Sequence, residues 1–347
     1  MSNEIFKGRN HKMVGDPSKR GINNFEKPEN FLKSCKKLIL YCKFCIPQII
    51  VAFIFAIIGA IFTIVGPNKL SQITDLITDG LISGIDLEKV QKIAVFLSVL
   101  YGLGFVFNYI QGFIMATVTQ RLSKSLRTDI SEKINRLPLK YFDSTSYGDV
   151  LSRVTNDVDT IGQTMNQSIG VLVSEVTLFL GSLFMMLKTN LIMTFSAVIA
   201  TIIGFLFMIL IISKSQKYFL RQQKYLGKIN GHIEEIYSGH VIVKVYNGEE
   251  KAKKTFDKIN EKLYESAWKS QFLSGLMMPL MGFIGNFAYV TVCVVGGTMA
   301  LDNKITFGVI VAFMIYVRLF TRPLSQIAQA FTNMQSTAAA SERVFEF

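Results

Sequence analysis

Six long stretches with few or no charged residues constrain this sequence more than any other feature. They cover residues 44–66, 93–120, 160–187, 190–213, 270–300 and 305–335. Glu175 is the only charged residue of the third stretch, and the sixth continues past Arg318 with few helix breakers. Because about 20 apolar residues cross a bilayer as a helix, we expect an all-α, polytopic membrane protein with six transmembrane helices.

The composition agrees with a membrane protein and excludes two other classes. Of the 347 residues, 50% are hydrophobic and 18% are charged, against about 25% charged in a typical soluble chain. This excludes a mostly disordered chain and a small disulfide-stapled secreted module. Cys42 and Cys45 form a C-x-x-C pair without a second pair or a nearby His, so we interpret them as apolar filling. The first apolar stretch begins too late for a cleavable signal peptide.

The basic residues predict which side of the membrane each segment faces. The net charge is +12, and 32 of the 37 Lys and Arg residues fall on the side of the two termini. Cytoplasmic segments carry the excess of basic residues. We therefore expect a plasma-membrane protein with both termini in the cytoplasm, and no nucleic-acid partner.

The two long cytoplasmic connections, residues 121–159 and 214–269, have helical patterns. Such patterns predict that the transmembrane helices continue as stalks, where about 15 extra residues add about 23 Å. We expect a partner to dock at the stalk tips. Apolar residues recur every three or four positions, or seven in one interval. They are Val118, just before the first connection, with Leu122, Leu126, Ile130 and Ile134 within it, and Phe219, Leu226, Ile229, Ile233 and Ile236 in the second.

Two segments precede the first span. Residues 1–27 are polar and without periodicity, which predicts disorder. Residues 28–43 predict an elbow helix in the inner membrane interface, with lysines that meet anionic headgroups. Its apolar stripe consists of Phe31, Cys35, Leu38 and Cys42.

Helix breakers and aromatic residues mark the first stalk tip. Pro138 is expected to end the descending helix. Asp143 is expected to cap a short helix over residues 144–147, with Gly148 in its last turn. Asp149 would then cap the ascending arm. The aromatic residues presented at this tip are Tyr141, Phe142 and Tyr147.

The second stalk tip follows the same design. Gly239 is expected to break the arm, and a short apolar segment with an exposed aromatic residue, Tyr246, follows it.

On these residues, the sequence resembles the transmembrane domain of type I ATP-binding-cassette (ABC) exporters, the multidrug and lipid exporter group. The matching motifs are residues 137–157, 233–250 and 338–345, and the resemblance covers about residues 28–347. It implies a transmembrane domain over 44–337 and the start of a linker over 338–347. It also implies that both tips are coupling helices that contact nucleotide-binding domains through Tyr141, Phe142, Asp143, Tyr147, Gly239, Val243, Tyr246 and Asn247.

The resemblance further implies partners and cofactors beyond these residues. They are a second transmembrane half, in a homo- or heterodimer, and an ATPase domain that binds ATP and Mg. The sequence contains no G-x-x-x-x-G-K-[ST] phosphate loop. We therefore expect these 347 residues to be no enzyme by themselves, and to be either a fragment or a half-transporter with a separate ATPase.

Polar residues inside the spans are candidates for a substrate path. Glu175 shares a helix face with Ser168, Leu172, Phe179 and Ser182, and a mid-membrane charge normally faces the protein interior or water. This face is expected to line a path for cationic or amphipathic substrates, with a protonated Glu175 bonded between helices as the alternative. Further candidates are Asn108, Gln111, Asn286, Tyr289 and Met314, for which helix–helix hydrogen bonding or core packing is the alternative.

Two classes of function remain open. The first is ATP-driven export of an amphipathic compound, such as a drug, lipid or peptide. The second is an ATPase-independent secondary transporter or channel, which explains six spans but leaves the stalks and tips without a purpose. A third interpretation, a scaffold or sensor, rests only on the missing ATPase.

Overall fold

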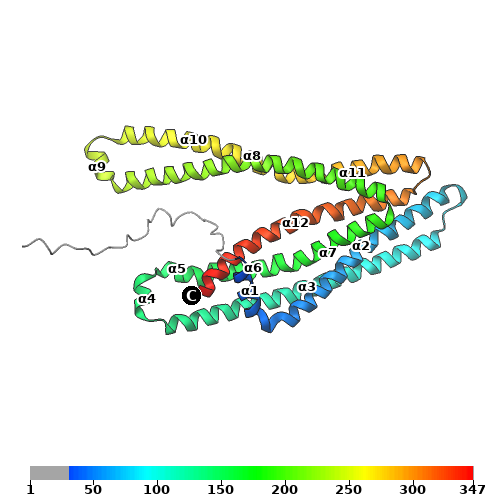
Figure 1. Ribbon diagram of the computed structural model, residues 1–347, viewed down its shortest axis with the longest axis horizontal. Coiled ribbons are helices and arrows are strands. Elements are labelled where there is room, and N and C mark those ends of the chain that lie inside the picture. Colours follow the sequence, from blue (N-terminus) through cyan, green and yellow to red (C-terminus); the bar gives the residue numbers. More distant parts are fainter. Residues whose placement is uncertain (1–30, 347) are drawn as a thin grey trace, which may run out of the picture. The chain divides into compact units, whose positions relative to one another are not determined.

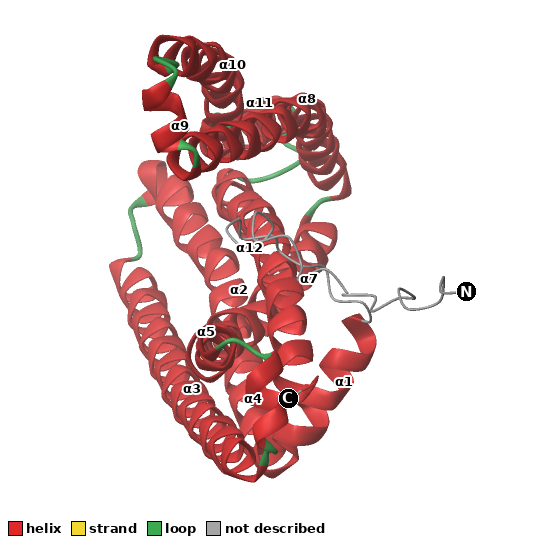
Figure 2. Cartoon of the chain, turned by 90° about the vertical axis from the view of Figure 1, so that its left-hand side faces the viewer, coloured by secondary structure: helices red, strands yellow, loops and turns green. Residues whose placement is uncertain are grey.

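The computed structural model describes residues 31–346, and the predicted disordered segment 1–27 lies outside this range. The described residues form helices joined by short turns, without a strand among them (Figures 1 and 2). They divide into two compact units. The larger unit comprises residues 31–210 and 276–346, and the smaller unit comprises residues 211–275.

The helices are long, and most turns between them are short. The larger unit contains α1 (Phe31–Tyr41), α2 (Ile46–Ser83), α3 (Leu87–Arg136), α4 (Leu139–Ser144), α5 (Tyr147–Ser152), α6 (Val158–Thr164), α7 (Gly170–Thr189), α11 (Met277–Leu301) and α12 (Phe307–Glu346). A 3-10 turn, η2 (Cys42–Cys45), follows α1, and two π-helical segments, η3 (Arg153–Asp157) and η4 (Met165–Ile169), flank α6. Helix α8 (Leu191–Ser238) begins in the larger unit and continues into the smaller one, which also holds α9 (His240–Val245) and α10 (Glu249–Gly275).

Six helical runs among the described residues are long and apolar enough to cross a membrane, which confirms the predicted all-α fold class. They are 40–53 residues long, about twice what a bilayer requires. Pro323 does not end α12, which continues to Glu346. The helices therefore extend well beyond the predicted spans, as the periodic stripes indicated.

The first of two cores in the larger unit joins α7, α12, α11 and the start of α8. Phe313 and Tyr316 are its largest fully buried side chains. The Tyr316 hydroxyl donates to the backbone oxygen of Ile64 on α2 at 3.3 Å. Figure 1 shows α2, α7 and α12 running alongside one another. Helix α12 is the most enclosed of the six runs. In its most apolar stretch half of the residues are buried, against a third or less in the other five runs.

The second core joins α1, α3, α6 and the end of α12. Leu122, Leu126 and Ile130 of the predicted first stripe are buried in it, so this stripe is the inner face of the first stalk. The second stripe, in the smaller unit, is less buried than the first. Ile229 is buried, whereas Phe219 and Ile233 are exposed.

Helix α1 occupies the region of the predicted elbow helix, but its apolar stripe has a different contact. Leu38 and Cys42 are buried in the second core, against other helices of the chain. Ile39 and Leu40 are the exposed apolar residues of α1. This part of the stripe, Leu38 and Cys42, is therefore a packing face, because α3, α6 and α12 offer it apolar partners.

Candidate functional site

The first stalk tip differs in detail from the prediction. Helix α3 ends at Arg136, and Pro138 is the N-cap of α4. The predicted helix over residues 144–147 is wrong, because the short helix covers Leu139–Ser144 instead. The ascending arm is capped by the Ser146 side chain, which accepts from the Asp149 N–H at 3.3 Å, so neither Asp143 nor Asp149 has the predicted capping role. The predicted C-terminal turn at Gly148 lies within α5.

The aromatic residues of the first tip fall into two groups. Tyr141 and Phe142 on α4 are half-buried and pack edge to face, with ring centroids 5.6 Å apart. Tyr147, at the start of α5, has 83% of its surface exposed, and Asp143 is also exposed. Tyr147 is therefore the aromatic residue of this tip that is most available to a partner.

The second tip agrees with the prediction. Helix α8 ends at Ser238, Gly239 is the N-cap of α9, and Asn247 has a positive φ of 51° in the turn that follows. Helix α9 has no buried residue, and Tyr246 is 81% exposed. The half-buried Val243 packs toward Gly248 across the turn. The tip therefore presents an apolar and aromatic surface.

The face of α7 around Glu175 packs against α12. Phe179 stacks on Phe320, with ring centroids 4.9 Å apart, and Ser168 of the preceding segment η4 accepts from the Asn333 side chain at 3.1 Å. Glu175 Oε2 is buried, and no hydrogen-bond partner for it lies among the described residues. Arg322 of α12 lies within electrostatic range of this carboxylate.

The other path candidates are dispersed through the larger unit. Asn108 is exposed beside Gly59, and Gln111 packs against Gly170, so each side chain lies where a neighbouring helix carries a glycine. Tyr289 is half-buried with the Arg318 guanidinium over its ring at 5.4 Å. Asn286 is exposed and Met314 is half-buried. The role of these residues in a substrate path stays a prediction.

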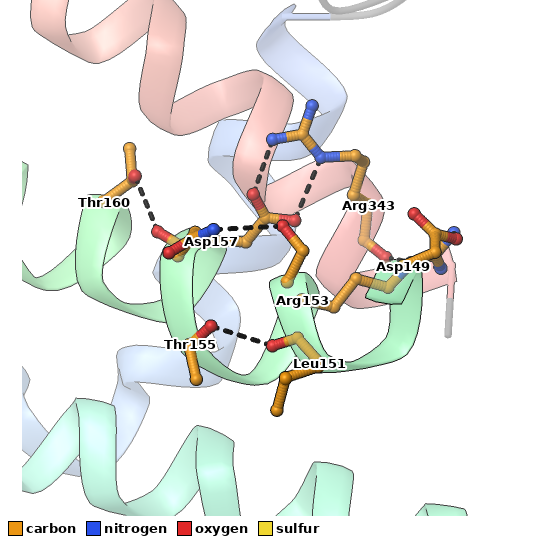
Figure 3. A network of polar contacts seen from close by, with 9 residues as sticks. Asp149, Leu151, Arg153, Thr155, Asp157, Thr160 and Arg343 are labelled. Carbon is orange, nitrogen blue, oxygen red and sulfur yellow. Dashed lines mark hydrogen bonds and ion pairs between the residues drawn. The ribbon is translucent and has the colours of Figure 1, made fainter. Parts of the chain in front are cut away.

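Sequence reasoning missed a polar network that joins the first stalk to the end of α12. Arg343 binds Asp157 with two hydrogen bonds, from Nε at 2.9 Å and from a terminal nitrogen at 2.5 Å (Figure 3). Arg153 donates to the backbone oxygen of Arg343 at 3.1 Å and pairs with Asp149 at 3.3 Å. No local pattern in the sequence identifies this pair, because periodicity assigns a residue to a helix face but does not identify its partner on another helix.

Comparison with known proteins gives the family. Residues 49–324 match the model of the ABC transporter transmembrane region. A fatty acid ABC transporter ATP-binding/permease protein of Mycobacterium bovis is 35% identical over 76% of this chain and 42% of its own length. The uncharacterized ABC transporter ATP-binding protein YfiC of Bacillus subtilis is 32% identical over 86% of this chain and 49% of its own length.

A more distant relative is the ATP-dependent lipid A-core flippase 1 of Colwellia psychrerythraea. It is 23% identical over 89% of this chain and 51% of its own length. The chain thus spans about half the length of the curated relatives it matches. Six long apolar helices, two stalk tips and a family match over residues 49–324 lead to one conclusion: the chain belongs to the ABC transporter transmembrane region family, as its resemblance to ABC exporters predicted.

Proposed function

We propose that the chain is the substrate-translocating half of an ATP-driven exporter of amphipathic compounds and works as a dimer. The observation that carries this proposal is the pair of stalk tips, where Tyr147 and Tyr246 are 83% and 81% exposed. An aromatic side chain so exposed gains no burial until a partner supplies a pocket, and such anchors often dominate a protein interface. The proposed partner is a nucleotide-binding ATPase domain, which would hold ATP and Mg.

The same proposal includes a substrate class. Two relatives are named for fatty acid transport and for lipid A-core flipping. In this chain, the stacked Phe179 and Phe320 lie next to Glu175 and Arg322 on the facing helices α7 and α12. Aromatic and charged groups together suit a molecule with an apolar body and a charged head. We propose a lipid-like amphipath, with drugs and peptides as the alternatives.

The proposed location is the plasma membrane, with both termini in the cytoplasm. Support comes from the concentration of Lys and Arg residues on the side of the stalks, because basic segments stay cytoplasmic.

Tyr246→Ala tests the docking role of the second tip. The chain and its ATP-binding partner are reconstituted in lipid vesicles, and ATP hydrolysis and transport of a fluorescent acyl compound are measured together. Losing an anchor worth about 2 kcal/mol weakens docking roughly thirtyfold, so transport per ATP hydrolysed should fall while the unfolding of the isolated chain stays unchanged.

Tyr264→Ala is the matched control. Tyr264 is a 63% exposed tyrosine on α10, about 23 Å along the helix from the tip, so its loss should leave coupling intact. Equal losses in both variants would remove the support for docking at α9. Transport that proceeds without ATP would instead favour the secondary transporter or channel.

A further inference from the structure

The end of α12 is held to the first stalk by an ion pair between a buried carboxylate, Asp157, and a half-buried guanidinium, Arg343. The Asp157 side chain is 5% exposed, and both of its oxygens accept from Arg343 (Figure 3). Two parallel hydrogen bonds between a guanidinium and a carboxylate fix distance and orientation together. Removing Arg343 would leave the buried Asp157 charge uncompensated. This contact is therefore stiff in a way that an apolar contact, which can slide, is not.

Neighbouring contacts reinforce the pair. Arg153 reaches the backbone oxygen of Arg343 and also pairs with Asp149 on α5, the helix that starts at the first tip. Val344, next to Arg343, is buried in the second core with Val158 and Ile161 of α6. The Phe345 ring, which packs against the same core, contacts Tyr41 of α1, with ring centroids 5.8 Å apart.

The backbone at Asp157 has an unusual form that bears on this contact. The segment Arg153–Asp157 is π-helical, between α5 and α6. A π-helical turn changes which way the following side chains point, and such turns recur at functional sites. Here the segment contains both residues that bond to Arg343, namely Arg153 and Asp157.

We propose that the Asp157–Arg343 pair is a joint that makes the first stalk tip and α12 move as one body. Helix α12 is unbroken from Arg343 back to Phe320 and Arg322, about 35 Å along the axis. A displacement of the tip is thereby carried to the residues around Glu175. Asp157 and Arg343 are positioning residues in this scheme. Only its last step, the link between tip displacement and transport, rests on the proposed function.

The joint is tested first on the chain in lipid nanodiscs, by the distance between two spin labels. Gly148→Cys and Glu346→Cys carry the labels in a background with all native cysteines replaced by Ala. Both positions are exposed, and a side chain added at Gly148 meets nothing within 4 Å. Asp157→Asn and Arg343→Gln should broaden the distance distribution. Arg343→Lys, which keeps the charge but not the two-pronged contact, should give an intermediate width.

A second ion pair on the same arm is the matched control. Asp159 pairs with Arg127 of α3 at 2.5 Å, and the two side chains are 56% and 44% exposed. Asp159→Asn should leave the distribution as narrow as in the unmodified chain. Unchanged distributions in both Asp157→Asn and Arg343→Gln would overturn the joint, as would equal broadening in Asp159→Asn.

The second readout is transport per ATP hydrolysed in vesicles that contain the ATP-binding partner. Asp157→Asn should lower this ratio at least tenfold, and the exchanged pair Asp157→Arg with Arg343→Asp should recover part of it together with a narrower distance distribution. A normal ratio in Asp157→Asn would overturn the role of the joint in transport. Absence of ATP-driven transport in the unmodified protein would overturn the proposed function instead, and the spin-label distances would still decide on the joint.

Discussion

Gly308, near the start of α12, lies so close to α2 that a side chain has no room there. Its N–H donates to Asp75 Oδ1 at 2.8 Å, and the Thr306 hydroxyl donates to Asp75 Oδ2 at 3.0 Å. A Cβ atom added at Gly308 would lie 2.6 Å from Asp75 Oδ1 and still closer to the backbone oxygen of Ser71. Gly308→Ala should therefore separate the two helices.

The size of the effect follows from these contacts. Ordinary van der Waals contact between a Cβ and another heavy atom begins at 3.4 Å, so the Asp75 carboxylate would have to move by about 0.8 Å. The Ser71 oxygen cannot rotate away, because it belongs to the main chain. Overpacking costs about 1–3 kcal/mol, and a lost hydrogen bond to a charged acceptor about 1.5–3 kcal/mol. The higher helix propensity of Ala offsets at most about 1 kcal/mol of this loss of stability. The free energy of unfolding should fall by about 2–5 kcal/mol.

Denaturant unfolding of the purified chain in detergent micelles, followed by circular dichroism, measures this loss. Gly297→Ala on α11 is the control, because a Cβ there meets nothing within 4 Å. It should leave stability unchanged or raise it by up to about 1 kcal/mol. In the double variant with Asp75→Ala, the two losses should not add, because both act on one contact. If Gly308→Ala unfolded at the same denaturant concentration as Gly297→Ala, the steric reasoning would be refuted.

Three further predictions concern other contacts. Glu175→Gln should keep the fold but change which substrates stimulate ATP hydrolysis in the assembled transporter; the same stimulation by cationic and neutral compounds as before would leave only a structural role. Tyr41→Phe removes the hydrogen bonds to Asp129 and Ser125, so amide exchange in α1 should rise about fivefold or more, and unchanged exchange would contradict an anchoring role. Hydrogen bonds from Lys89 lower the pKa of Asp86 below its ordinary 3.8. The first turn of α3 should therefore be stable above pH 3.8 and lose protection as the pH falls through the lowered pKa, whereas in Asp86→Ala the exchange of these amides should show no such loss.

The sequence was sufficient for features that depend on local pattern. The length of the apolar stretches predicted six spans, and the periodic residues Leu122, Leu126 and Ile130 predicted the buried face of the first stalk. Gly239 predicted the break before α9, and it is the N-cap of that helix.

Register and partners could not be predicted in the same way. At the first tip, Asp143, Ser146 and Asp149 are all good N-cap residues, and the choice of Ser146 depends on α4 starting directly after Pro138. The stripe on α1 was apolar as expected, but periodicity does not distinguish a lipid-facing stripe from one that packs on protein. For the same reason, the pairing of Asp157 with Arg343, 186 residues away, left no local trace.

Helix α12 is bonded to different elements at its two ends, and one of its faces remains exposed between them. Asp75 of α2 holds its start and Asp157 of η3 holds its end. Between them, Phe313, Tyr316 and Phe320 are buried. The exposed face in this middle region carries polar residues at three- and four-residue spacing: Arg318, Arg322, Ser325 and Gln329. Polar side chains on a membrane helix normally face water or protein rather than lipid. A partner half or a water-filled path should therefore cover this face, and α12 is the helix through which a movement of the first tip would reach it.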